Sequence, residues 1–125
     1  MNIDNIKSQM RKGLLEFCIL LALRRGPAYS SELIGCLKEA RLIVVEGTLY
    51  PLLSRLKKDG LLAYTWQESA AGPPRKYYSL TPTGLETLEA LAVAWEEMSR
   101  TVRQLSAPAD SENASGIDNQ NEKEI

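Results

Sequence analysis

The sequence contains no histidine and only two cysteines, and these shortages limit the chemistry open to it. Without histidine there is no imidazole base and no ordinary catalytic triad. Cys18 and Cys36 lie far apart in apolar helical stretches, whereas metal sites use close cysteine pairs or Cys/His clusters. No glycine-rich phosphate loop follows a strand either. We therefore expect a protein that is not an enzyme and holds no metal or cofactor, with both thiols buried as packing residues.

Long apolar runs are also missing, although apolar residues make up 44% of the chain. The longest candidate, residues 13–23, contains Glu16 and falls short of the roughly 18 residues needed to cross a bilayer. No cleavage-type site follows it, so no secretory signal peptide is indicated. A chain of 125 residues is long enough for one domain with its own core. The prediction is a soluble cytoplasmic protein with no membrane partner.

Negative charge is scarce in the first 105 residues, despite an overall net charge of −1. Five of the 16 acidic residues but only one of the 15 basic residues fall within residues 106–125, which leaves residues 1–105 with a net charge of +3. We predict that residues 107–125 form a disordered acidic tail, because they contain almost nothing apolar. A mildly basic body is compatible with nucleic-acid binding if its cations cluster.

Apolar residues recur at helical spacing in the first part of the chain. Residues 4–25 predict a first helix, which the Gly-Pro pair at 26–27 ends. A second helix is predicted over residues 31–40, with Ser30 or Ser31 as its cap. The buried face of the first helix is predicted to consist of Ile6, Met10, Leu14, Phe17, Cys18 and Leu21.

The third predicted helix, within "EGTLYPLLSRLKKDG" (46–60), has two contrasting sides. Pro51 has no amide hydrogen and so places the start of the helix near residues 46–48, while Gly60 suits a left-handed C-cap. Four leucines fall within one narrow arc and predict a buried face: Leu49, Leu52, Leu53 and Leu56. The opposite side is polar and basic: Tyr50, Pro51, Ser54, Arg55 and Lys58, flanked by Lys57.

Two strand candidates follow at residues 61–67 and 75–80. The turn cluster between them, "ESAAGPP" (68–74), is predicted to be too long for a two-residue hairpin. Thr81 and Pro82 suit the N-cap and first position of a last helix over residues 82–106. This order predicts a mainly α fold with a small two-stranded β wing: a winged helix-turn-helix, whose third helix enters the major groove.

The polar side of the third helix and the return strand of the wing supply candidate DNA contacts. Front positions of a recognition helix reach deepest, so we assign Thr48, Tyr50, Pro51 and Ser54 to the groove floor. Phosphate contacts are assigned to Arg55, Lys57, Lys58, Arg75 and Lys76, and contacts to the flanking backbone to Arg11 and Lys12. Taken alone, the third helix could equally be a core helix with a solvated basic face.

The last predicted helix carries a heptad seam of large, mostly apolar residues. Their spacing alternates between three and four residues: Leu88, Leu91, Trp95, Met98, Val102 and Leu105. The seam could pack within one chain or against a second copy. We favour a homodimer, because a single helix after the wing has little domain left to pack on. Two-fold symmetry would place two recognition helices roughly 34 Å apart, one turn of DNA.

Two motifs, "TLYPLLSRLKKDGLL" (48–62) and "RKYYSLTPTG" (75–84), resemble the PadR family of bacterial transcriptional regulators. The likeness covers roughly residues 10–105, and the single helix after the wing is similar to the short branch of that family. It implies a homodimer that binds double-stranded DNA at a pseudo-palindromic operator, usually as a repressor. The wing of the family often carries arginine where this chain has Pro73.

The same branch implies an effector site. A tryptophan at the place of Trp95, paired with its symmetry mate, sandwiches planar apolar drugs there, so the resemblance implies a small planar hydrophobic ligand at the dimer interface. Such a cavity would be lined by Leu14, Phe17, Leu91, Ala92 and Met98.

The predicted organisation is a DNA-binding domain over residues 1–80, a dimerisation helix over 81–106 and the tail over 107–125. The alternative is a winged-helix protein-interaction module without specific DNA binding.

Overall fold

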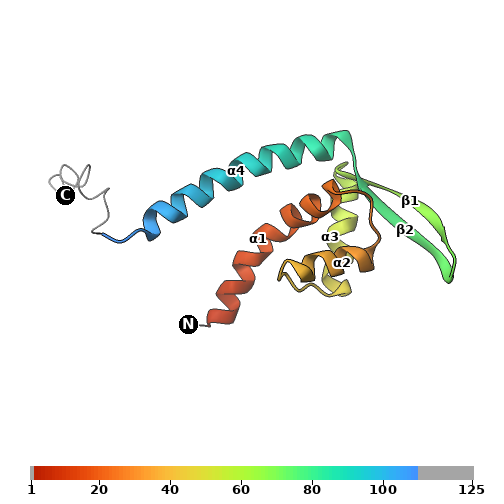
Figure 1. Ribbon diagram of the computed structural model, residues 1–125, viewed down its shortest axis with the longest axis horizontal. Coiled ribbons are helices and arrows are strands. Elements are labelled where there is room, and N and C mark those ends of the chain that lie inside the picture. Colours follow the sequence, from red (N-terminus) through yellow and green to blue (C-terminus); the bar gives the residue numbers. More distant parts are fainter. Residues whose placement is uncertain (1, 110–125) are drawn as a thin grey trace. The chain divides into compact units, whose positions relative to one another are not determined.

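The computed structural model describes residues 2–109. The elements follow one another as α1 (Ile3–Arg24), α2 (Ser30–Glu39), α3 (Glu46–Lys58), β1 (Leu62–Ser69), β2 (Gly72–Leu80) and α4 (Pro82–Ser106), as Figure 1 shows. This is the winged helix-turn-helix that the sequence predicts, mainly helical with one two-stranded sheet. Most of the predicted tail, residues 110–125, lies outside the described residues. No described helix is long and apolar enough to cross a membrane.

The chain forms two compact units, and the boundary between them falls after Leu91, inside α4. The first unit, residues 1–91, contains α1 to α3, the wing and the first turns of α4. The second unit begins at Ala92 with the rest of α4.

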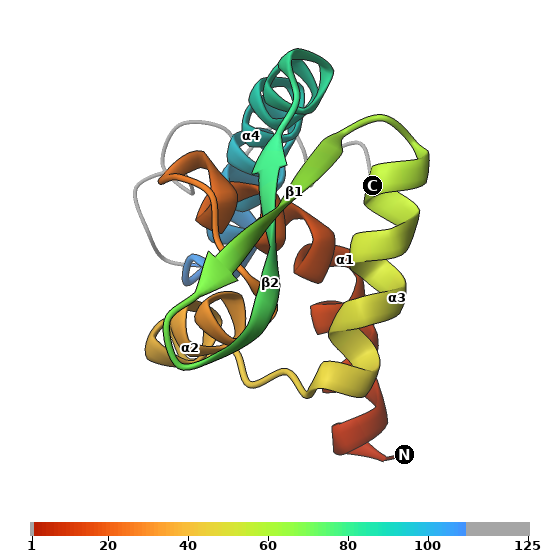
Figure 2. The same ribbon diagram turned by 90° about the vertical axis from the view of Figure 1, so that its right-hand side faces the viewer.

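The core of the first unit lies where helices α1, α2 and α3 meet the base of the wing. It draws on every element of that unit: Ile19, Leu20, Leu23, Leu33, Leu37, Val44, Leu49, Leu53, Leu56, Leu62, Tyr78 and Leu88. Apolar side chains collect there because removing their surface from water is the main favourable term in folding. In Figure 2, α3 runs beside the hairpin, and α3 contacts β1.

The predicted buried face of α1 is correct only in part: Phe17, Cys18 and Leu21 pack against the core. The fully buried residues are Ile19, Leu20 and Leu23, whereas Met10 is 67% exposed. The other predicted positions are only half-buried: Ile6, Leu14, Phe17, Cys18 and Leu21. Helical spacing identified an apolar stripe, but burial depends on which part of the helix meets α2 and β2, and the buried residues all lie near the C-terminal end of α1.

The two cysteines are half-buried free thiols. Burial raises the pKa of the Cys18 thiol, which keeps it protonated at neutral pH. Arg25 donates a hydrogen bond from Nη1 to Cys36 Sγ over 3.5 Å. Neither thiol is therefore as deeply buried as the sequence predicts.

The start of α2 differs from the prediction. Tyr29, not a serine, is the N-cap, and the Tyr29 amide donates a hydrogen bond to the Glu32 carboxylate over 3.3 Å. Ser30 is the first helical residue. Just before it, Ala28 pairs with Tyr78 of β2 through two backbone hydrogen bonds of 3.0 and 2.9 Å. This bridge attaches the wing to the start of α2.

Helix α3 has the two sides that the sequence predicts. Leu49, Leu53 and Leu56 are buried, and Leu52 is half-buried. The helix begins at Glu46 and therefore carries Pro51 in its second turn. It ends in a Schellman motif, in which the Gly60 amide donates to the Lys57 carbonyl and the Leu61 amide to the Leu56 carbonyl, both over 3.0 Å. Gly60 has a φ of 82°, the left-handed conformation that favours glycine.

The wing is longer than predicted, with a shorter turn. Leu62 pairs with Leu80 at the base and Ser69 with Gly72 at the tip, so only residues 70–71 connect the strands. The predicted long turn is wrong because β2 includes Pro73 and Pro74. Proline is tolerated at the edge of a sheet, and both strands of a two-stranded ribbon are edges. The register shifts between Gln67 and Ser69, which accommodates an extra residue near the tip.

A tight junction joins the end of α3, the base of the wing and the start of α4. Thr81 caps α4 as predicted, since its Oγ1 accepts a hydrogen bond from the Gly84 amide over 2.9 Å. The same Oγ1 donates to the Gly60 carbonyl over 2.6 Å, and the Thr81 amide donates to the Leu61 carbonyl over 3.1 Å. Gly84 is buried against Leu61.

Leu88 belongs to this core rather than to a subunit interface. It is fully buried within one chain, with an exposed fraction of 0%. The predicted heptad seam is therefore corrected at its first position, and its exposed part begins at Leu91, which is 37% exposed.

We predict that Gly84→Ala destabilises the fold. A methyl group on residue 84 would lie 2.1 Å from the Leu61 carbonyl oxygen, so the backbone of α4 or of the wing would have to shift. The expected loss is about 1–3 kcal/mol of unfolding free energy, measured by urea denaturation. Gly13→Ala is the control, because nothing lies within 4 Å of its added methyl, and it should be neutral or stabilising. Equal stability of the two variants would contradict the close approach.

Candidate nucleic-acid interface

The side of α3 opposite the leucines is open to solvent. Tyr50 is 46% exposed, and Thr48, Pro51 and Ser54 are exposed as well. These side chains are therefore accessible from solvent, which is the condition that a role in reading DNA requires. Burial of Leu49 and Leu53 at 0% exposure fixes this orientation, because rotating the helix would bring them into water.

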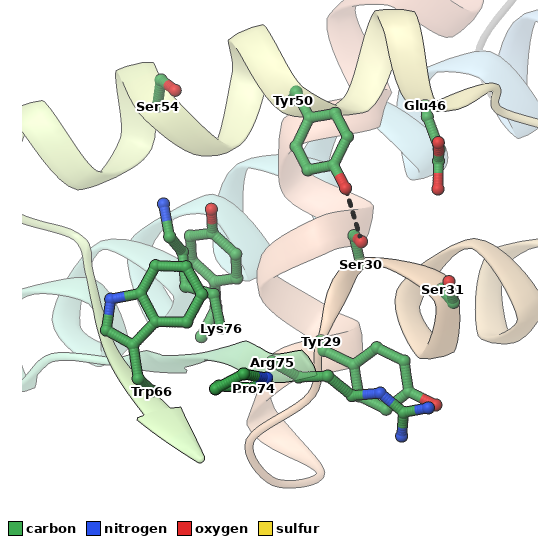
Figure 3. Close-up of a pocket in the computed structure, with 11 residues that line it drawn as sticks. Tyr29, Ser30, Ser31, Glu46, Tyr50, Ser54, Trp66, Pro74, Arg75 and Lys76 are labelled. Atoms are coloured by element: carbon green, nitrogen blue, oxygen red, sulfur yellow. Dashed lines mark hydrogen bonds between the residues drawn. The ribbon is translucent and has the colours of Figure 1, made fainter. Parts of the chain in front are cut away.

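A pocket of about 500 Å³, here termed the wing pocket, lies between this open side of α3, the start of α2 and the wing. Figure 3 shows side chains from all three elements around it. The site thus brings together four of the predicted DNA contacts, two from the helix and two from the wing: Tyr50, Ser54, Arg75 and Lys76. The other lining residues are Tyr29, Ser30, Ser31, Glu46, Trp66, Pro74 and Tyr78.

Both wing cations rest on aromatic rings. The Arg75 guanidinium lies 4.4 Å from the centroid of the Tyr29 ring. The Lys76 ammonium lies 4.3 Å from the centroid of Tyr64 and 5.3 Å from that of Trp66. A ring face attracts a cation without neutralising it, so these interactions hold the positive charges beside the pocket.

Sequence reasoning missed these rings as partners of the cations. The register would have indicated one of them, because Trp66 pairs directly with Lys76 across the hairpin. Tyr29 gives no such signal, since the loop before α2 reaches Arg75 only in the folded chain. Tyr29 also packs edge-on against Tyr77, with ring centroids 5.2 Å apart.

Arg55 already has a partner inside the protein. It forms an ion pair with Glu16 of α1, and its Nε donates to Glu16 Oε2 over 2.9 Å. This hydrogen bond, together with the charge of Glu16, raises the pKa of Arg55 above its ordinary value. The Arg55 side chain remains 59% exposed, so it joins α1 to α3 while its outer edge faces solvent.

The other predicted cations fall into two places. Lys57 and Lys58 are exposed near the end of α3, with the Lys57 ammonium 5.4 Å from the Tyr64 ring centroid. Arg11 and Lys12 of α1 line a second pocket of about 320 Å³ together with Thr48. Thr48 therefore lies beside α1 and residues 42–45 and does not line the wing pocket.

Ser30 and Tyr50 are joined across the wing pocket. The Tyr50 hydroxyl lies 3.0 Å from Ser30 Oγ, a hydrogen bond in which either atom can donate (Figure 3). The sequence predicts Ser30 only as a possible helix cap and does not predict its hydrogen bond to Tyr50. In the same pocket, burial raises the pKa of Tyr78, and the neighbouring phenols of Tyr50 and Tyr64 raise it further.

The residues predicted to line an effector cavity lie in both units of the chain. Leu14 and Phe17 are half-buried on α1, and Leu91 is exposed. In the second unit Ala92 is half-buried, whereas Trp95 and Met98 are 42% and 56% exposed. Within residues 2–109, no three side chains of His, Cys, Asp or Glu gather in a way that could hold a metal ion.

Residues 19–90, from the second half of α1 into α4, match the model of the PadR-like family of transcriptional regulators. The chain belongs to this family. A PadR-like transcription factor from Bacteroides fragilis is 61% identical, with a match that covers 82% of this chain and 99% of that one at a TM-score of 0.69. A PadR-like transcriptional regulator from Bacillus cereus is 42% identical, covering 80% and 98% at a TM-score of 0.72.

A transcriptional regulator of Mycobacterium tuberculosis is 44% identical over 59 residues, which are 47% of this chain and 54% of that protein. The chain thus spans about half the length of this relative. The PadR-like relatives are transcriptional regulators and not enzymes.

Proposed function

We propose that this PadR-like protein is a homodimeric repressor that binds a pseudo-palindromic operator in the cytoplasm. The observation that carries the proposal is the wing pocket, where the open polar side of α3 meets two cations of β2. In this proposal residues 1–80 bind DNA, residues 81–106 form the dimerisation helix, and each subunit places α3 in a major groove.

In this proposal the front of α3 contacts the bases, and the residues around it contact the phosphates. Thr48, Tyr50, Pro51 and Ser54 are exposed on the first two to three turns of α3, where they would meet base edges. Phosphates would be held by the wing, whose two cations Arg75 and Lys76 lie beside the pocket. Lys57, Lys58 and the outer edge of Arg55 extend the cationic surface along α3, and Arg11 and Lys12 extend it along α1.

We expect Arg75→Ala combined with Lys76→Ala to weaken binding to all duplexes alike. The two cations would neutralise phosphates, so removing them should lower affinity for the operator and for random DNA by the same factor. The slope of log affinity against log salt should flatten by about 0.9 for each phosphate that the variant no longer neutralises. Fluorescence anisotropy at several salt concentrations measures both quantities.

The control for the wing variant removes the same charge elsewhere. Arg24→Ala combined with Lys38→Ala affects exposed cations at the ends of α1 and α2, outside the wing pocket. This control should keep the wild-type salt slope. An unchanged slope in the wing variant would refute its role in phosphate binding, and a wild-type protein that ignores every duplex at low salt would favour the protein-interaction module instead.

The second part of the proposal, the homodimer, rests on the apolar seam of α4. Within the second unit four seam residues are exposed at helical spacing, with exposed fractions from 42% to 81%: Trp95, Met98, Val102 and Leu105. Large apolar side chains in such a row are typical of a surface that packs against another helix. A second copy of the same seam would bury them and would place two recognition helices on one face of the DNA.

Val102→Glu combined with Leu105→Glu should dissociate the dimer. Carboxylates at these two positions would be buried and would repel their symmetry mates, so sedimentation should report a monomer at micromolar concentration. Val93→Glu is the matched control, because Val93 is 60% exposed on the same helix but off the seam. A dimer that survives the double substitution, or that Val93→Glu disrupts equally, would place the interface elsewhere.

The third part of the proposal is relief of repression by a planar apolar ligand held between two copies of Trp95. Its support is the exposed indole at a seam position, where a flat aromatic face suits a flat ligand.

A planar cationic dye should quench the emission of Trp95. The chain has two tryptophans, so the titration is best made in a Trp66→Phe background, where Trp95 is the only tryptophan that emits. We expect saturable quenching, together with release of bound operator in a parallel anisotropy experiment. Absence of quenching would remove the ligand site. Equal operator release in a Trp95→Ala variant would place the dye elsewhere.

A further inference from the structure

We infer that Ser30 is a specificity-determining positioning residue, which acts by holding the Tyr50 side chain in the orientation that reads DNA. This inference rests on the proposed DNA-binding function and adds a residue that lies on α2, outside the recognition helix. Its basis is the hydrogen bond of 3.0 Å between Ser30 Oγ and the Tyr50 hydroxyl.

The two ends of the Tyr50 side chain are fixed by different elements. Its backbone belongs to α3, whereas its hydroxyl bonds to the first residue of α2 (Figure 3). That end of α2 is itself held, because Ala28 pairs with Tyr78 of the wing. The phenol therefore spans the wing pocket between two supports that are both part of the folded first unit.

The Ser30–Tyr50 hydrogen bond, here termed the bridge, matters because the Tyr50 side chain is otherwise open to solvent on one side. It is 46% exposed, and a tyrosine on an exposed helix face can rotate about two side-chain bonds. Ordering a mobile side chain on binding costs free energy, and a side chain ordered in advance avoids that cost. A hydrogen bond to a neighbouring rigid element is a common way to lock a recognition residue in one rotamer.

The bridge does not exhaust the hydrogen-bonding capacity of the two hydroxyls. One of them donates its proton within the pair, and the other keeps a proton for an external acceptor. Both oxygens also retain acceptor lone pairs. The pair can therefore present one donor and several acceptors in a fixed direction, which suits the edge of a base better than the diffuse charge of a phosphate.

Ser31 offers a matched comparison. It is the next residue of α2, it is exposed, and it lines the same pocket, as Figure 3 shows. An effect of Ser30 that came only from polarity at the start of α2 would be shared by Ser31, whereas an effect of the bridge would not.

The test measures discrimination, the ratio of affinities for the selected operator and for a random duplex of the same length. We expect Ser30→Ala to lower this ratio by about 3- to 10-fold, the range for loss of one neutral hydrogen bond, with little change on random DNA. Ser30→Ala should have no further effect in a Tyr50→Phe background, because the bridge is already absent there. Ser30→Thr keeps the hydroxyl and should retain most of the discrimination, and Ser31→Ala, which leaves the Ser30–Tyr50 hydrogen bond intact, should lose less of it than Ser30→Ala.

A second measurement follows the bridge without DNA. Carbon-13 relaxation of the labelled Tyr50 ring in the free protein should show greater motion in Ser30→Ala than in the wild type or in Ser31→Ala. An equally ordered ring in Ser30→Ala would overturn the positioning role, as would additive losses in the double variant or equal losses for Ser31→Ala.

The inference and the proposed function fail in different ways. If the wild type discriminates the operator and Ser30→Ala discriminates it equally well, only the inference falls. If the wild type binds no duplex at all, the proposed function falls and takes the inference with it, whatever the ring relaxation shows.

Discussion

The proposed DNA-binding face of this PadR-like protein depends on the burial of one row of leucines. Leu49, Leu53 and Leu56 anchor α3 in the core, and each contributes about 1.5–3 kcal/mol relative to exposure in water. Their burial leaves the helix only one rotation, which turns its polar side outward. Pro51 then lies on the solvent side of the helix. Proline has no amide hydrogen to donate to the Gly47 carbonyl one turn earlier, but Gly47 is exposed, so water can reach that carbonyl instead.

Placement of the wing follows from two short connections. At its base, the Thr81 hydroxyl links the end of α3 to the start of α4, and Gly84 allows these backbones to approach. Further along β2, the pairing of Ala28 with Tyr78 fixes the wing to the start of α2. Cations of the wing and side chains of α3 therefore meet across one pocket because short hydrogen bonds to the backbone, rather than long side chains, set the distance between their elements.

The sequence predicts the elements and the two sides of α3 because those features are local. Periodic leucines, Gly60 and Thr81 act within one or two turns of their own position, so each carries its own signal. The missed features depend on packing between distant segments. Leu88 has the spacing of the seam but is buried within its own chain. The sequence predicts Ser30 only as a possible helix cap, because its partner Tyr50 lies on another helix. Which part of α1 is covered likewise depends on where α2 and β2 lie.

The prolines of β2 have a consequence for the colloidal behaviour of the protein. A two-stranded ribbon has an unpaired edge on each strand, and such edges can recruit strands from other molecules. Pro73 and Pro74 have no amide hydrogen, and because the amides of adjacent strand residues point to opposite edges, one of the two removes a donor from the outer edge of β2 near its tip. The outer edge of β2 is therefore a poorer template for a foreign strand near its tip than an unbroken row of donors would be.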